Sequence, residues 1–172
     1  MSIEKTDYFL DALDLRLLDA LQQDAGVANH ELAQRCGVSP STCLRRVRYL
    51  ETRGIIERRV ALLQPERLAQ AVGHGLTALV EVTLDRQGEE HLAVFERLAV
   101  AEAAVQQCYR VSPGPDFVLV VAVRDMPAYL ALSQRLFTQN ANVRNVKAFF
   151  STRRAKFAPA QPLPQVRPEV GA

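Results

Sequence analysis

The sequence predicts an α+β protein built from two small domains, and three observations support this prediction. Residues 1–63 carry apolar side chains at helical spacing, and residues 76–157 alternate between strand-like and helix-like patterns. Between them, residues 64–75 contain Pro65, Gly73 and Gly75 and indicate a linker. A chain of 172 residues is long enough for two such domains.

The first domain is predicted to begin with two helices. In the stretch LDLRLLDAL, Leu13, Leu17 and Leu21 recur at helical spacing and would form one apolar stripe. Asn29 is a candidate N-cap for a short second helix, and Gly37 is a candidate left-handed C-cap for it. The turn at Gly37 would lead directly into a third helix.

Strong local signals mark the start of that third helix. Ser39 is a suitable N-cap, Pro40 suits the first helical position, and Val38 is placed to act as a hydrophobic staple. After Gly54, the stretch IIERRVALL has an apolar–charged–apolar pattern that predicts a strand or hairpin. Three helices followed by a short ribbon indicate a winged helix-turn-helix domain over residues 1–63.

The second domain, residues 76–157, is predicted to contain four strands and two helices. Alternation in LTALVEVTL and the apolar run in DFVLVVAV are typical of strands, and Asp125 is placed to start the second helix. The predicted strands are 76–84, 105–111, 116–123 and 143–154, and the predicted helices are 89–99 and 126–137. The order β-α-β-β-α-β is the ferredoxin-like arrangement. Residues 158–172 are rich in proline and poor in large apolar side chains, which predicts a disordered tail.

The third predicted strand indicates self-association. Its residues are apolar on both faces, whereas the two helices of a ferredoxin-like unit cover only one face of the sheet. Burying each large apolar side chain is worth about 1.5–3 kcal/mol, so the open face needs a cover. A second copy of the same sheet is the simplest cover, which predicts a homodimer. The alternative is that the C-terminal tail covers this face.

Positive charge is concentrated in one segment. The whole chain has a formal net charge of only +2, but residues 38–63 carry six arginines and two glutamates, giving this segment a charge of +4. With about 100° of rotation per helical residue, Cys43, Val47 and Leu50 would face the domain interior. Ser41, Arg45, Arg48, Tyr49 and Thr52 would then face solvent.

This hydroxyl- and guanidinium-bearing face suits a major groove of DNA. Residues near the N-terminus of such a helix meet base edges, which favours Ser41, Thr42 and Arg45 for base contacts. The remaining arginines are better placed for phosphates. The full predicted DNA-binding set is Ser39, Ser41, Thr42, Arg45, Arg46, Arg48, Tyr49, Arg53, Arg58 and Arg59. The alternative is an ordinary solvated helix face; for Cys43, the alternatives are a core position and a redox sensor.

Composition argues against several other classes of protein. The three cysteines show no CxxC spacing, so neither a disulfide framework nor a metal site is expected. Acidic residues near the N-terminus do not fit a secretory signal. The longest apolar run, 117–123, is far shorter than the roughly 20 residues that span a bilayer. A cytoplasmic protein without membrane contact and without a cofactor is expected.

Two stretches resemble a known family. LDALDLRLLDALQQDAGVANHELAQRCGVSPSTCLRRVRYLETRGIIERRVALLQPERL is similar to the N-terminal half of the Lrp/AsnC family, the leucine-responsive and asparagine-operon regulators. AVQQCYRVSPGPDFVLVVAVRDMPAYLAL resembles the sensing domain of that family. The resemblance implies a transcriptional regulator that binds partly palindromic double-stranded promoter DNA. It also implies sheet-mediated homodimers that assemble into octamers or similar rings, and a small effector, usually an amino acid.

The resemblance places the effector site at residues 111–116, in the loop between the second and third strands. Ser112 and Asp116 could accept hydrogen bonds from an ammonium group, and Gly114 would permit close approach of the backbone. The family usually has glycine directly after the Ser or Thr of this loop, whereas this chain has Pro113, followed by Gly114 and Pro115. Two prolines remove two backbone donors. Hairpin capping is the alternative role for Ser112 and Asp116.

Two other functions compete with effector-responsive regulation. An architectural DNA-binding protein would use the second domain for assembly alone. The sirohaem decarboxylases resemble this family in overall fold, but they need histidine and arginine around a tetrapyrrole. None of His30, His74 and His91 falls on a predicted strand, and no Ser/His/Asp grouping or phosphate loop is present in the sequence. A non-enzymatic protein is therefore expected.

Overall fold

A computed structural model describes residues 10–73 and 75–164, and these residues fall into two compact units. One unit comprises Met1–Leu62 together with Phe157–Ala172, and the other comprises Leu63–Lys156. Residues 158–164 contain no helix or strand, and Gln161 exchanges two hydrogen bonds with Gln22 at 2.5 and 3.2 Å. The remaining part of the predicted disordered tail, residues 165–172, lies outside the described residues.

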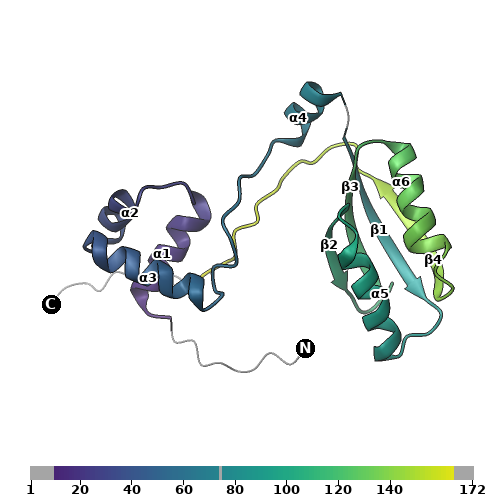
Figure 1. The fold of residues 1–172 in the computed structure, drawn as a ribbon, viewed down its shortest axis with the longest axis horizontal. Helices are drawn as coiled ribbons and strands as arrows, with labels where there is room; N and C mark the ends of the chain where they lie inside the picture. The colour runs from purple at the N-terminus through teal and green to yellow at the C-terminus, as the bar shows by residue number, and fades with distance from the viewer. Residues whose placement is uncertain (1–9, 74, 165–172) are drawn as a thin grey trace. The chain divides into compact units, whose positions relative to one another are not determined.

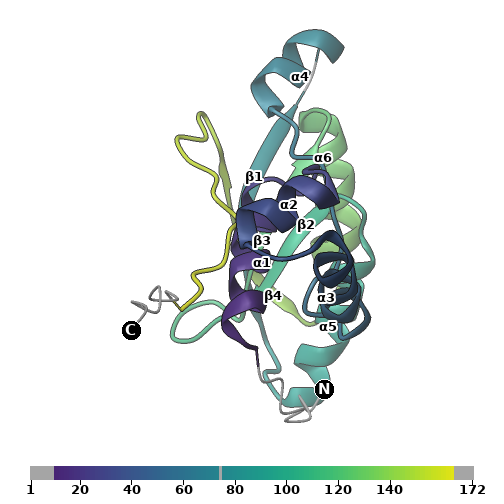
Figure 2. The same cartoon turned by 90° about the vertical axis from the view of Figure 1, so that its left-hand side faces the viewer.

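The first unit is built from three helices, α1 (Ala12–Gln23), α2 (Asn29–Cys36) and α3 (Pro40–Thr52), which are seen in Figures 1 and 2. Their apolar stripes meet in one core, as the leucine spacing predicts. The buried members of this core are Leu17, Leu21, Leu32, Ala33, Cys36, Cys43 and Val47. The predicted cap at Asn29 is wrong: Ala28 holds that position, and the Asn29 side chain donates to the Pro40 carbonyl at 2.9 Å.

The segment after α3 does not form the predicted ribbon. Residues 57–64 contain neither helix nor strand, so the strand or hairpin predicted for IIERRVALL is wrong. Val60, Leu62 and Leu63 are 60–66% exposed, and no strand of the described residues pairs with them. A single strand leaves its backbone groups without partners, so the apolar pattern alone could not make a strand here.

The second unit contains one four-stranded antiparallel sheet with helices on one face (Figure 1). Its strands are β1 (Leu76–Leu84), β2 (Val105–Arg110), β3 (Phe117–Val123) and β4 (Val143–Phe150), in the order β2-β3-β1-β4. The helices are α5 (Glu89–Ala101) and α6 (Met126–Ser133), and α6 continues as the π-helical segment η1 (Gln134–Thr138). The predicted β-α-β-β-α-β order and the Asp125 N-cap are confirmed.

The predicted linker contains a helix that sequence reasoning missed. Pro65 opens α4 (Pro65–Val72), and Gly73 ends it with a left-handed φ of 76°. None of the α4 residues is buried, and Leu68 and Val72 are 44% and 49% exposed. The proline and glycine that suggested a linker are in fact the start and stop signals of this short helix.

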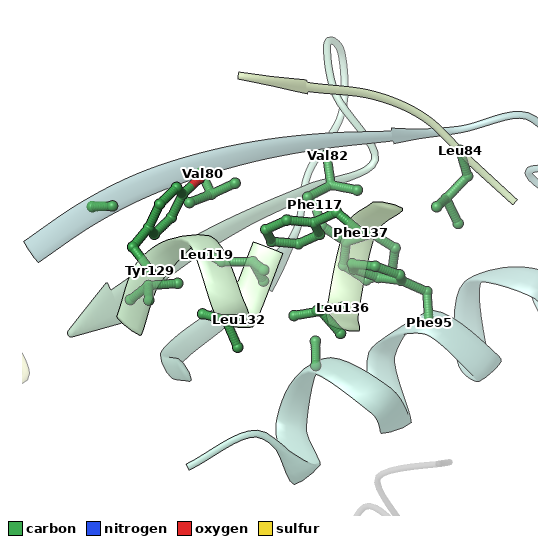
Figure 3. Packing of buried hydrophobic residues seen from close by; sticks show 13 residues of the cluster. Val80, Val82, Leu84, Phe95, Phe117, Leu119, Tyr129, Leu132, Leu136 and Phe137 are labelled. Carbon is green, nitrogen blue, oxygen red and sulfur yellow. The ribbon is translucent and has the colours of Figure 1, made fainter. Parts of the chain in front are cut away.

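The core of the second unit lies between the sheet and its two helices (Figure 3). Phe95 of α5 packs on Phe117 of β3, with ring centroids 4.8 Å apart. Alternate residues of β1 and β3 point into this core and are fully buried. On the opposite face, Leu79 and Phe149 are cross-strand partners that are 44% and 54% exposed. The open apolar face expected from the sequence is therefore present in the single chain.

None of the helices among the described residues is both long enough and apolar enough to cross a bilayer.

Candidate nucleic-acid interface and effector loop

The start of α3 has the geometry that its sequence predicts. Gly37 adopts a left-handed φ of 68°, and the Ser39 hydroxyl accepts a hydrogen bond from the Thr42 backbone N–H at 3.2 Å. The same hydroxyl lies 3.1 Å from the Ser41 hydroxyl and donates to Thr42 Oγ1 at 2.9 Å. Because Ser39 caps the helix, its side chain is engaged in the protein. Ser41 remains exposed at the first turn of α3.

The inner face of α3 is fixed by buried apolar residues. Cys43 and Leu50 are fully buried and Val47 is 5% exposed, so the predicted inward stripe is confirmed. Burial raises the pKa of the Cys43 thiol, which leaves little of the reactive thiolate. Cys43 therefore behaves as a core residue, and the redox-sensor alternative loses support.

The exposed arginines of α3 and of the segment that follows it have three different settings. Among residues 10–73 and 75–164, Arg45 and Arg48 have no acidic partner. Arg53 lies over the Tyr49 ring, 5.3 Å from its centroid, in a cation–π contact. On the segment after α3, Arg59 pairs with Glu51 at 2.8 Å, and Arg58 lies 3.5 Å from the neighbouring Glu57. Arg45 and Arg48 are thus the guanidinium groups most available to an anionic ligand.

Arg46 differs from the other arginines of α3 because it points toward the start of α1. Its Nη2 donates to Asp11 at 2.6 Å, and its Nη1 lies 3.2 and 3.3 Å from the two carboxylate oxygens of Asp14. Asp14 is only 1% exposed. Sequence reasoning missed both carboxylates, although two aspartates at the start of α1 were a visible signal.

The predicted effector loop joins β2 to β3, and its residues differ in whether their side chains are already bound to the rest of the domain. Gly114 has a φ of 128°, a conformation that favours glycine, and Ser112 is exposed. Asp116 is committed to the fold: its Oδ2 accepts from the Leu84 backbone N–H at 2.7 Å and from Gln87 Nε2 at 3.2 Å. Both partners lie outside the β2–β3 hairpin, so these contacts tie Asp116 to the end of β1 and to Gln87 and are not the hairpin capping considered for it.

The residue before the loop is also held by its own domain. Arg110 donates from Nε to Glu96 at 2.6 Å and from Nη1 to Glu89 at 2.8 and 2.9 Å. These contacts fasten the end of β2 to α5. Elsewhere in the unit, a groove of about 360 Å³ lies between α5 and η1 and is lined in part by Val94, Leu98 and Leu136. It includes none of the three predicted effector residues.

The chain combines a helix-turn-helix unit, whose third helix carries arginines, with a separate α+β unit. This combination defines a class of protein, the DNA-binding transcriptional regulators with a ligand-binding domain. Residues 10–57 match the winged helix-turn-helix DNA-binding domain, and residues 77–161 match the Lrp/AsnC ligand binding domain. The chain belongs to the Lrp/AsnC family of transcriptional regulators.

Individual relatives agree with this assignment. A Haemophilus influenzae HTH-type transcriptional regulator is 38% identical over 141 residues, covering 82% of each chain. The leucine-responsive regulatory protein of Escherichia coli is 34% identical over 140 residues, covering 81% of this chain and 83% of its own length. The crystal structure of a Neisseria meningitidis transcriptional regulator in complex with L-methionine has a TM-score of 0.77 at 28% identity, covering 90% and 97% of the two chains.

Proposed function

We propose that this regulator binds partly palindromic DNA as a homodimer, with the exposed face of α3 in the major groove. The observation that carries this proposal is the pairing pattern of the α3 arginines. Arg45 and Arg48 project from the helix without an acidic partner among the described residues, whereas the inner face is fully packed. Unpaired guanidinium groups beside exposed hydroxyls suit the acceptors of base edges and phosphates. Such a regulator would act in the cytoplasm, where it meets promoter DNA.

Within this proposal, the first turns of α3 read sequence and the later arginines bind the backbone. Ser41, Thr42 and Arg45 lie closest to the helix N-terminus, the part that approaches base edges in helix-turn-helix proteins. The phosphate-binding group consists of Arg48, Arg53, Arg58 and Arg59, with Tyr49 supporting Arg53.

The open face of the sheet supports the homodimer. Leu79, Phe149 and Tyr109 are 44–54% exposed on the face that α5 and α6 leave uncovered. A second copy of the same face would bury these side chains symmetrically. Two recognition helices would then meet half-sites about one helical turn of DNA apart or a multiple of it. Assembly of such dimers into octamers or similar rings belongs to the same proposal.

We infer that the effector is an amino acid that binds at the loop formed by residues 111–116. The exposed Ser112 hydroxyl and the backbone around Gly114 could meet the charged groups of such a ligand. Support comes from the related Neisseria regulator, whose structure contains L-methionine. Because Asp116 already accepts two hydrogen bonds, its part in the site is to hold the loop and to offer its remaining acceptor capacity.

A second candidate is an architectural DNA-binding protein that responds to no effector. Two observations favour it: Asp116 is used inside the fold, and Pro113 and Pro115 offer no backbone donor. Thermal-shift measurements with the twenty common amino acids separate the two candidates. A reproducible rise in melting temperature with one of them supports sensing, and no response across the panel supports the architectural role.

Selection from a randomised DNA library tests the DNA-binding proposal. The purified chain should enrich a partly palindromic sequence, and binding to it should weaken steeply between 50 and 200 mM salt, with a logarithmic slope of about −0.9 per phosphate contact. Enrichment of no sequence, with equal binding to all fragments, would contradict sequence-specific regulation.

A further inference from the structure

One ion-pair cluster links the recognition helix to the first helix. It contains Arg46 of α3, Asp14 of α1 and Asp11, the N-cap of α1. The two aspartates also cap α1 reciprocally: the Asp14 backbone N–H donates to the Asp11 carboxylate at 2.9 Å, and the Asp11 N–H donates to that of Asp14 at 3.2 Å. Arg46 therefore binds a pair of carboxylates that the start of α1 already holds in place.

Burial of one member, Asp14, makes this cluster costly to break, although the Arg46 and Asp11 side chains are 33% and 39% exposed. Asp14 is 1% exposed, and Arg46 is the cation that pairs with it among the described residues. A buried carboxylate that loses its cation is strongly unfavourable, because neither water nor another charge replaces the partner. Arg46 is consequently not free to move to a DNA phosphate, in contrast to Arg45 and Arg48.

The same contacts limit how α3 can rotate about its own axis. Arg45 and Arg46 are neighbours that point about 100° apart around the helix. Fixing the Arg46 guanidinium on α1 therefore also fixes the direction in which Arg45 leaves the helix. Apolar packing of Cys43 and Val47 selects the inner face of α3, and the guanidinium that bridges two carboxylates adds a directional contact with a defined geometry.

We propose that Asp14, together with Asp11, is a positioning residue for DNA recognition, and that it acts through Arg46 to set the orientation of the base-contacting side of α3. This inference rests on the proposed function, because it assigns how the same helix achieves discrimination. In this proposal Arg46 binds the two aspartates of α1 instead of the DNA phosphate that the sequence predicted for it.

Conservative substitution of Arg46 separates positioning from phosphate binding. Arg46→Lys keeps the positive charge and can still meet a phosphate, but a single ammonium cannot reproduce the forked contact to both carboxylates. Arg35→Lys is the matched control, because the ion pair that Arg35 forms among the described residues is the exposed one with Glu31 on α2. Affinities for the library-selected sequence and for random DNA are measured by fluorescence anisotropy at several salt concentrations, well below each melting temperature.

We expect Arg46→Lys to weaken binding to the selected sequence at least tenfold, with little change in binding to random DNA or in its salt dependence. Asp14→Asn should show the same loss of discrimination, and Arg35→Lys should match the wild type. The double variant Asp14→Leu/Arg46→Met removes the buried carboxylate and its cation together, so it keeps a folded protein available if either single variant unfolds. This double variant should be folded but should discriminate poorly between the selected sequence and random DNA.

Two results would overturn the positioning role. The single variant Arg46→Met removes the charge altogether. If Arg46→Lys binds both DNAs as the wild type does, and the binding of Arg46→Met depends less steeply on salt than that of the wild type, Arg46 contacts a phosphate. Equal losses for both DNAs, or full discrimination by the folded double variant, would show a purely structural cluster. Failure of the wild-type protein to discriminate any sequence would instead contradict the proposed function itself.

Discussion

The carboxylate of Asp116 accepts a hydrogen bond from the backbone N–H of Leu84 at 2.7 Å, and this contact fastens the end of β1 to the start of β3. Asp116→Ala would leave that N–H without its partner, which costs about 1–3 kcal/mol. Chemical denaturation should show this loss in the free energy of unfolding, without any effector present. Asp85→Ala, a nearby exposed substitution with the same charge change, should stay within about 0.5 kcal/mol of the wild type. Equal stabilities for the two variants would contradict the fastening role.

The left-handed turn at Gly37 gives a second prediction. A Cβ at this position would meet no atom within 4 Å, so the penalty of a substitution is conformational rather than steric. Gly37→Ala should lower the free energy of unfolding of the N-terminal unit by about 1 kcal/mol. Gly37→Asn should lower it less, because asparagine tolerates this conformation. Equal effects of alanine and asparagine in equilibrium denaturation would contradict this explanation.

Asp11, the N-cap of α1, makes the free energy of unfolding depend on pH. The hydrogen bond from the Asp14 backbone N–H, together with the Arg46 guanidinium, lowers the pKa of Asp11 below its ordinary value of 3.8. A lowered pKa in the folded state means that the stabilisation is complete above pH 3.8 and is lost as the pH falls through the lowered value.

Comparison of Asp11→Asn with the wild type measures this dependence. The difference in their free energies of unfolding should be constant from pH 7 to pH 5 and should shrink below pH 3.8, because protonation removes the same charge as the substitution. A difference that stays constant down to pH 2.5 would contradict the assignment.

The predicted dimer interface can be tested by one charge on the open sheet face. Leu79→Asp should weaken dimerisation at least about a hundredfold, since each of two symmetric copies loses a buried leucine worth about 1.5–3 kcal/mol. Sedimentation equilibrium measures the association constant. Val100→Asp on α5 is the control, because Val100 is 66% exposed on the helical layer. A dimer that survives Leu79→Asp and is lost in Val100→Asp would place the interface on the helices instead.

Local signals predicted most of the fold because neighbouring residues determine caps and alternation. Ser39, Gly37 and Asp125 act where they were expected, and the four strands fall within a few residues of the predicted ranges. Residues 55–63 were predicted wrongly because a strand needs a partner, which a sequence pattern does not specify.

The arginines of α3 show the same limit at the candidate site. Periodicity placed Arg45, Arg46 and Arg48 away from the core, and all three have at least partly accessible side chains. Their different roles depend on contacts with residues far away in sequence, such as the pairing of Arg46 with Asp14, 32 positions away. Such tertiary ion pairs have no periodic signature, so the sequence could not separate a positioning arginine from one that faces DNA.

The central claim is that the exposed side of α3 reads DNA sequence, and Arg45→Ala tests it most directly. The measurement is the ratio of affinities for the library-selected sequence and for random DNA, with Arg58→Ala as the control that removes one exposed guanidinium from outside α3. We expect Arg45→Ala to reduce this ratio about 5- to 150-fold, equivalent to about 1–3 kcal/mol of base discrimination. Arg58→Ala should weaken both affinities alike and leave the ratio unchanged. An unchanged ratio in Arg45→Ala would contradict the claim that this face of the helix reads bases.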